Sequence, residues 1–247
     1  MRFIHKQDTD STNNDAHELA RSGETGPLWI RADTQTSGKG RRGREWVSKS
    51  GNLFTSGLFP AFADVSKTVQ LSFIAALAIY ETIKTYAPLA NVSLKWPNDV
   101  LVEGAKISGV LLETGQVKFG PYVVVGIGLN LTHHPDLTLY PATHLLEHVD
   151  PSDMNRPEPI YTGPEGVLAV LASRFEIWRG VHAQDGFQTI AKAWMEKAHG
   201  MGKRAYIDNS PVTLRGLGPN GELRVEYDNG TVDTVVAADV SYHPPSQ

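Results

Sequence analysis

Gln35-Thr-Ser-Gly-Lys-Gly-Arg-Arg-Gly-Arg-Glu-Trp46 restricts the choice of fold more than any other stretch, because it sets glycines and cations between two β-type segments, 28–32 and 52–59. Its glycines satisfy the G-x-G-x-x-G spacing of a dinucleotide-binding turn. Such a turn must open a helix, however, and the residues that follow here are strand-like. Glycines let the backbone approach a ligand, and guanidinium groups match phosphate oxygens. We therefore interpret the stretch as an anion-binding loop between two strands rather than a nicotinamide site.

The same loop permits two other interpretations. Five cations stand between Lys39 and Lys49 against the single carboxylate of Glu45, whereas the whole chain of 247 residues has a net charge of −4. An exposed basic loop without a ligand has this composition, and so does a nucleic-acid contact in which Trp46 stacks on a base. The acidic overall balance speaks against nucleic acid as a partner of the whole chain.

Outward from the loop, the pattern mixes helices and strands as far as residue 199. The longest helical pattern, 66–87, places Val69, Phe73 and Leu77 on one face and stops at Pro88, as a central core helix does. Residues 132–166 are rich in Pro, His and Asp and predict irregular structure around one short helix. The remaining predicted elements are helices at 11–23, 165–183 and 186–198 and strands at 92–96, 99–102, 107–113 and 122–131.

Beyond residue 200 the pattern changes to short strands separated by turns, at 204–207, 212–217, 223–227 and 231–236. The turn Asp228-Asn-Gly230 between alternating runs is a strong hairpin signal. We therefore predict an α+β fold, with a domain of mixed sheet and helices at 1–199 and a small β-barrel domain at 200–247. A domain of that size approaches the lower limit for independent folding, so it should pack on the larger one.

Composition excludes several classes of protein. The chain has no cysteine, which rules out disulfides, thiolate metal ligands and a cysteine nucleophile. No apolar run reaches the roughly 18 residues that span a membrane, and the first ten residues lack the apolar region of a secretory signal. By elimination we expect a cytoplasmic protein without a membrane partner.

Three further motifs place polar residues or glycines at the ends of predicted strands. Lys95-Trp-Pro-Asn-Asp99 is a proline turn that presents a lysine, an amide and a carboxylate together. Lys106 begins the apolar run 107–113, in which Gly109 leaves room for a ligand beside the backbone. Gly126-Ile-Gly-Leu-Asn130 ends its strand with small residues and an amide. Each motif also has a plain structural interpretation, as a polar turn, a hairpin end or a bulge.

His144-Leu-Leu-Glu147-His148 matches H-x-x-E-H, the inverted zinc-peptidase pattern. The candidate helix is very short, because it lies between Pro141 and Pro151. A catalytic zinc ion also needs a third protein ligand, for which Glu158 and Glu165 are the candidates. We favour a surface helix end over a metal site.

Taken in order with Asp10-Ser-Thr-Asn13, the motifs at 35–46, 95–99, 106–113 and 126–130 resemble the biotin protein ligase family in both order and spacing. The resemblance is specific from about residue 3 to 131 and weaker beyond. It implies a catalytic domain of the class II synthetase-like type followed by an SH3-like C-terminal domain. It also implies an ATP-dependent reaction that forms biotinyl-5′-AMP, releases pyrophosphate and transfers biotin to a lysine of a carrier domain.

The resemblance implies a role for each motif residue. Lys106 would orient the biotin carboxylate, and Arg41 would hold the adenylate phosphate; these two are the expected catalytic residues. The expected biotin-binding residues are Ser11, Thr12, Asn13, Gln35, Gly38, Lys39, Gly40, Arg41, Lys106 and Gly109. The expected ATP- and adenylate-binding residues are Arg41, Arg42, Arg44, Trp46, Lys95, Asn98, Asp99 and Asn130. Asp99 would also hold Mg²⁺, directly or through water.

The resemblance also implies partners and leaves one related class open. The implied protein partner is a biotin carboxyl carrier domain, with ATP and Mg²⁺ as cofactors and the enzyme a monomer or homodimer. Only ten residues precede Ser11, so we expect a monofunctional ligase without the DNA-binding domain of some family members. His144 stands where the family commonly has serine, which weakens the zinc interpretation further. The lipoate ligases share the fold and the adenylation chemistry, and they remain the alternative.

Overall fold

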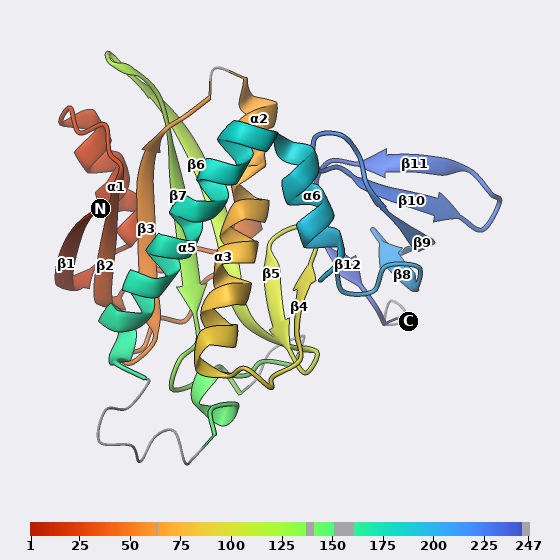
Figure 1. Cartoon of the computed structure of the whole chain (residues 1–247), viewed down its shortest axis with the longest axis horizontal. Coiled ribbons are helices and arrows are strands. Elements are labelled where there is room, and N and C mark those ends of the chain that lie inside the picture. Colours follow the sequence, from red (N-terminus) through yellow and green to blue (C-terminus); the bar gives the residue numbers. More distant parts are fainter. Residues whose placement is uncertain (63, 137–140, 151–160, 244–247) are drawn as a thin grey trace.

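The computed structural model describes residues 1–247 except 63, 137–140, 151–160 and 244–247, and it contains two sheets (Figure 1). The larger sheet has seven strands in the order β1-β2-β3-β7-β6-β5-β4. Its strands are β1 (Arg2–Thr9), β2 (Leu28–Gln35), β3 (Leu53–Pro60), β4 (Val92–Lys95), β5 (Asp99–Val102), β6 (Ala105–Val117) and β7 (Gly120–Leu129). Only β1 and β2 pair in parallel, and every other pair is antiparallel. The predicted mixed sheet is therefore confirmed.

Helices cover both faces of this sheet because its central strands alternate between two cores. Trp29, Phe59 and Phe175 belong to the larger core, where each ring contacts the other two edge-on or tilted, with centroids 5.1 to 5.6 Å apart. Their strand neighbours Leu28 and Leu58 belong to a smaller core. The helices of the larger core are α3 (Leu71–Tyr86), α5 (Gly163–Asp185) and α6 (Phe187–Met195), and α1 (Thr12–Arg21) packs on the smaller one.

Two local expectations need correction. The predicted helix at 66–87 is divided into α2 (Val65–Val69) and α3, and Val69 is exposed rather than on the core face. Gln70 stands between the two helices, where its buried side chain accepts a hydrogen bond of 2.7 Å from His182 on α5. That contact holds Gln70 against α5 at the point where the two helices divide.

The second sheet lies beyond α6 and has five antiparallel strands in the order β11-β10-β9-β8-β12. These are β8 (Arg204–Ile207), β9 (Ser210–Leu217), β10 (Leu223–Tyr227), β11 (Val232–Val235) and β12 (Val240–Ser241). It shares the larger core, and Trp96 Nε1 donates a 3.0 Å hydrogen bond to the carbonyl oxygen of Gly221. This hydrogen bond fixes the C-terminal sheet against the Trp96 turn. The division into two domains at 199/200 stays a prediction.

The middle of the large sheet is open on the face of α1 because glycines replace side chains there. Gly109 on β6 pairs directly with Gly128 on β7, and Gly126 lies two residues away on the same strand. A Cβ atom on Gly126 would lie 2.3 Å from Asn13 Oδ1, so an alanine there would displace that side chain. Among the described residues, no helix is long and apolar enough to cross a membrane.

Candidate active site

A pocket lies over these glycines, and residues from all five sequence motifs line it. Its walls come from the start of α1, the 38–46 loop, the 95–99 turn, β6, β7 and the segment before β12. The expected site residues that line it are Ser11, Thr12, Asn13, Gln35, Lys39, Gly40, Arg41, Arg44, Trp46, Lys95, Asn98, Asp99, Lys106 and Gly109. Segments more than 200 residues apart in the sequence, from Ser11 to Val240, therefore meet around one cavity.

One end of the pocket is uncharged and rich in hydrogen-bonding groups. Gln35 Oε1 accepts hydrogen bonds from the backbone nitrogen of Thr12 at 2.9 Å and from its hydroxyl at 3.2 Å. Ser56, buried below, has its Oγ 2.7 Å from Thr12 Oγ1 and 2.5 Å from Asn13 Oδ1. Ser11 is the N-cap residue of α1 but makes no side-chain cap, contrary to the usual role of such a serine. This end offers preoriented donors and acceptors to a neutral polar ring.

Lys106 and Asp99 form the centre of the pocket. Lys106 Nζ lies 2.6 Å from Asp99 Oδ1, and both side chains are partly buried. Asp99 is the first residue of β5, and Lys106 pairs with Leu101 of the same strand, across a bulge between Val100 and Leu101. Lys106 Nζ also lies 5.6 Å from the ring centre of Trp46. A substrate carboxylate that approaches Lys106 can replace Asp99 as its anionic partner.

Trp46 forms part of the floor, directly on the paired glycines. A Cβ atom on Gly128 would lie 2.3 Å from Trp46 Cε2, and one on Gly109 would lie 3.2 Å from Trp46 Cζ3. The indole Nε1 is buried, and the described residues provide no hydrogen-bond acceptor for it. A buried donor without a partner costs free energy, so Trp46 is held there by its packing on the glycines rather than by a hydrogen bond.

The 38–46 loop is an ordered hairpin over the other end of the pocket. Lys39 pairs with Glu45 across the hairpin, and the backbone nitrogen of Trp46 donates to Gly38 at 2.9 Å. Its tip is the 3₁₀ turn η1 (Arg41–Gly43), in which Arg42 adopts a left-handed conformation with φ of 55°. Lys39 Nζ reaches across to Asn14 Oδ1 at 2.5 Å, which ties the loop to α1. The loop is therefore closed over the pocket.

Cations dominate this second end. Arg41 Nη1 donates to Asn98 Oδ1 at 3.2 Å and lies 3.8 Å from Asp239 Oδ1. Burial lowers the pKa of Arg41, although a guanidinium keeps its charge at any physiological pH. Burial also lowers the pKa of Lys95, and Asp99 partly opposes that shift. Partly desolvated cations attract phosphate more strongly than cations in water, because the local dielectric constant is lower.

Three expected site residues lie outside the pocket lining. Asn130 is buried and its Nδ2 donates to the carbonyl oxygen of Thr143 at 3.0 Å, so it holds the chain after β7. Gly38 lies at the base of the loop, and Arg42 points to Asp239 with half of its side chain exposed. The adenylate contact expected of Asn130 stays a prediction, and in this structure its Nδ2 group is already bonded within the protein.

Asp239 is the site residue that sequence reasoning missed. Its carboxylate lies within 3.8 Å of Arg41, 3.5 Å of Arg42 and 3.2 Å of Arg44. It comes from the segment between β11 and β12, so the C-terminal sheet completes the cationic end of the pocket. An isolated aspartate between short strands carries no motif, and no local signal could have linked it to a loop almost two hundred residues earlier.

Comparisons with known proteins agree with this geometry. The model of the biotin/lipoate A/B protein ligase family matches residues 4–130. The biotin--[acetyl-CoA-carboxylase] ligase of Paracoccus denitrificans is 37% identical over 241 residues, which are 95% of this chain and 98% of that protein. The ligase of the same name from Mycobacterium tuberculosis is 35% identical over 94% of this chain and 85% of its own length.

A solved structure extends the likeness to three dimensions. The biotin protein ligase from Aquifex aeolicus, in complex with biotin and ATP, superimposes with a TM-score of 0.77 at 25% identity and covers 97% of both chains. The chain thus belongs to the biotin/lipoate A/B protein ligase family. Within that family, its similarity over nearly the whole length is to proteins named as biotin ligases.

Proposed function

We propose that the chain is an ATP-dependent biotin protein ligase. It activates biotin as biotinyl-5′-AMP with release of pyrophosphate, and then transfers biotin to one lysine of a biotin carboxyl carrier domain. The observation that carries this proposal is the order of groups in one pocket, where a neutral hydrogen-bonding end, a central lysine and a cationic end follow one another. That order matches an acid with a neutral ring on one side and the phosphates of ATP on the other.

Binding places the reacting atoms side by side. Thr12 and Gln35 hold the ureido ring at the neutral end, and the glycines of the floor leave room for the rest of biotin. Lys106 then pairs with the carboxylate, which takes the place of Asp99. Holding two substrates in contact removes the entropic cost of a bimolecular encounter, a term worth up to roughly 7–11 kcal/mol.

In the first step a carboxylate oxygen attacks the α-phosphorus of ATP. A C–O–P linkage forms, the bond to the β-phosphate oxygen breaks, and pyrophosphate leaves with the electron pair. Negative charge moves towards the leaving group, and Arg41, Arg44 and Lys95 stand on that side of the pocket. Fixed cations at the place where charge develops lower the barrier without reorganisation.

Mg²⁺ fits the donor set at this end. The ion is usually held in proteins by one or two carboxylates together with substrate phosphates and water, and Asp99 supplies a partly buried carboxylate in the pocket. When bound, Mg²⁺ neutralises phosphate charge. Once the substrate carboxylate has taken its place at Lys106, Asp99 would hold the ion directly or through water.

In the second step the neutral ε-amine of the carrier lysine attacks the carbonyl carbon of the adenylate. An amide bond forms, the C–O bond to the phosphate breaks, AMP leaves and the amine loses a proton. Lys106 stabilises the oxygen that gains charge, and Arg41 holds the phosphate until the carrier arrives. A closed loop excludes water, which would otherwise hydrolyse the mixed anhydride.

Exchange of radiolabel between pyrophosphate and ATP tests the first step without knowledge of the carrier. The rate of exchange is measured for purified protein with Mg²⁺ in the presence of biotin, lipoate or octanoate, and without any acid. We expect exchange with biotin alone. Exchange only with lipoate or octanoate would assign the chain to the lipoate branch of the family, and no exchange with any acid would contradict adenylation altogether.

The carrier is tested separately, by transfer of biotin to a purified carboxyl carrier domain. Labelling is expected at one lysine, and replacement of that lysine by arginine should abolish it. We propose the cytoplasm as the place of the reaction, the compartment expected from the sequence.

A further inference from the structure

The H-x-x-E-H motif at 144–148 does not form the metal site that its spacing suggests. The short helix there is a single 3₁₀ turn, η2 (Leu145–Glu147), and His148 turns towards Thr143, with its Nε2 2.8 Å from Thr143 Oγ1. Of the two carboxylates considered as a third ligand, Glu165 lies at the start of α5 and Glu158 falls outside the described residues. Another histidine, however, joins His144 and Glu147.

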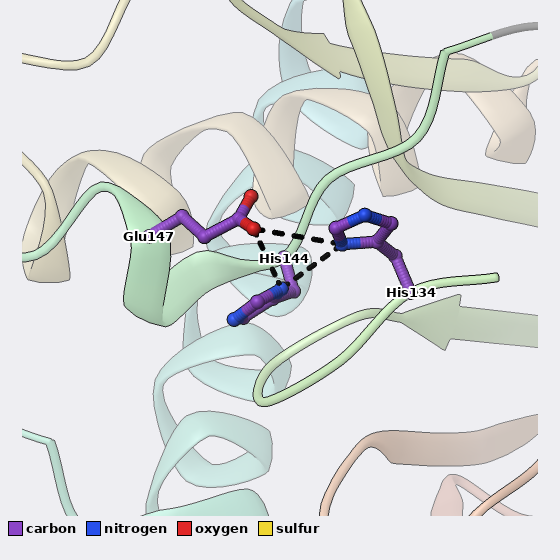
Figure 2. A group of neighbouring side chains, drawn as sticks. All are labelled: His134, His144 and Glu147. Carbon is purple, nitrogen blue, oxygen red and sulfur yellow. Dashed lines mark hydrogen bonds and ion pairs between the residues drawn. The ribbon is translucent and has the colours of Figure 1, made fainter. Parts of the chain in front are cut away.

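His134, from the chain that follows β7, meets His144 and Glu147 (Figure 2). The two Nδ1 atoms lie 3.0 Å apart, and Glu147 Oε1 lies 3.4 Å from His144 Nδ1 and 3.8 Å from His134 Nδ1. Neighbouring ligand atoms of a tetrahedral Zn²⁺ ion with bonds of about 2.1 Å are roughly 3.4 Å apart. A point about 2.1 Å from all three atoms lies roughly 0.7 Å out of their plane, as at a tetrahedral centre with one open position.

We propose that His134, His144 and Glu147 bind one divalent ion of the zinc type. Two imidazoles and a carboxylate suit Zn²⁺ and its transition-metal neighbours, whereas Mg²⁺ prefers oxygen ligands only. The side chains of His134, His144 and Glu147 are 24%, 18% and 44% exposed. The ion therefore has a route in from solvent, and water can fill the open position.

The surroundings hold the carboxylate in the orientation that binding needs. Thr143 Oγ1, in a residue only 4% exposed, donates to Glu147 Oε2 at 2.5 Å and leaves Oε1 directed at the two rings. Such outer partners orient ligands and usually strengthen metal binding 10- to 100-fold, as an order of magnitude.

Metal binding would also brace the catalytic pocket. The residues just before His144 run parallel to β6. The backbone nitrogen of Lys106 donates to the carbonyl oxygen of Pro141 at 2.7 Å, and the backbone nitrogen of Thr143 donates to the carbonyl oxygen of Lys106 at 3.0 Å. An ion that joins His134 to His144 therefore ties the chain after β7 to the segment that supports Lys106. We assign the ion a structural role, because its three ligands lie outside the lining of the pocket.

The test is calorimetric titration of Zn²⁺ into full-length protein stripped with a chelator, without nucleotide or biotin. One equivalent should bind to the wild type and raise its melting temperature, since a ligand that binds only the folded state stabilises it. We expect at least about a tenfold weaker Zn²⁺ affinity in each of the variants His144→Asn, His134→Asn and Glu147→Gln. Loss of an outer partner alone typically lowers metal affinity by that factor, and these variants lose a ligand itself. Their melting temperatures in chelator show whether they remain folded.

His5→Asn is the matched control, because His5 Nε2 also faces a carboxylate, Asp33 Oδ2, at 2.9 Å but on the exposed strand β1. Its Zn²⁺ affinity should equal that of the wild type. The proposal is overturned if the stripped wild type binds no single equivalent. It is equally overturned if the three ligand variants bind as the wild type does, or if His5→Asn loses the same affinity.

Discussion

The carboxylate of Asp239 lies 3.2 Å from Nη2 of Arg44 and so joins the C-terminal sheet to the loop that covers the pocket. Arg41 and Arg42 approach the same carboxylate. Three guanidinium groups around one anion are arranged as they would be around a phosphate. These contacts tie the loop to the segment before β12 in its closed position.

Asp239→Asn should loosen the loop. The pairs are partly exposed, with Arg44 at 53% and Asp239 at 37%, so each contributes no more than about 1 kcal/mol. Trypsin should therefore cleave after the loop arginines several-fold faster in the variant, as measured by the rate of appearance of the fragments. Asp233→Asn, on the exposed strand β11, makes the same change of charge and should leave the rate unaltered. Equal rates for Asp239→Asn and wild type would contradict the closing role.

Lys106→Gln should slow biotin adenylation while leaving the fold intact. The variant keeps a polar side chain but loses the charge that Asp99 and the substrate carboxylate need. Loss of one preorganised charge-stabilising group typically lowers kcat by about 10²–10³. Pyrophosphate exchange measures the effect. Lys118→Gln, in the exposed turn between β6 and β7, is the control and should exchange at the wild-type rate. A Lys106→Gln enzyme with full activity would remove Lys106 from the mechanism.

Gly128→Ala should displace Trp46 from the floor of the pocket. The added Cβ would lie 2.3 Å from Trp46 Cε2, so the indole must move. We expect the affinity for ATP, measured by calorimetry, to fall by about tenfold or more, which corresponds to about 1.4 kcal/mol. Gly180→Ala on α5, where nothing lies within 4 Å of the new Cβ, should leave ATP affinity unchanged. Unaltered affinity in Gly128→Ala would show that Trp46 does not contribute.

Lys95 should make ATP binding sensitive to alkaline pH. Burial lowers the pKa of Lys95, and only the protonated amine attracts phosphate. As the pH rises, Lys95 therefore loses its charge at a lower pH than an ordinary lysine, whose pKa is about 10.4. The dissociation constant of ATP, measured from neutral pH to about pH 10, should increase over that range. Lys95→Arg should be insensitive there, because a guanidinium stays charged. Identical profiles for the two proteins would contradict this assignment.

Sequence patterns predicted most elements of the fold because each pattern is local. The proline turn at 95–99 and the Asp228-Asn-Gly230 hairpin lie where turn chemistry places them, and α5 and α6 follow their apolar spacing. β1 escaped prediction because its side chains are mostly exposed, as expected for an edge strand that has little apolar alternation. The division of the long helix at Gln70 depends on a partner from α5, which no periodicity reveals.

The candidate site divides in the same way. The sequence alone determined that a glycine- and arginine-rich loop, a Lys-Trp-Pro-Asn-Asp turn and Lys106 occur in this chain, because these are properties of short segments. Only the tertiary structure decided that Asp239 closes the loop, that Asn130 turns inward, and that His134 rather than His148 faces His144. Such pairings depend on how distant segments pack, and that is settled by the burial of the whole core and not by any residue's neighbours in the chain.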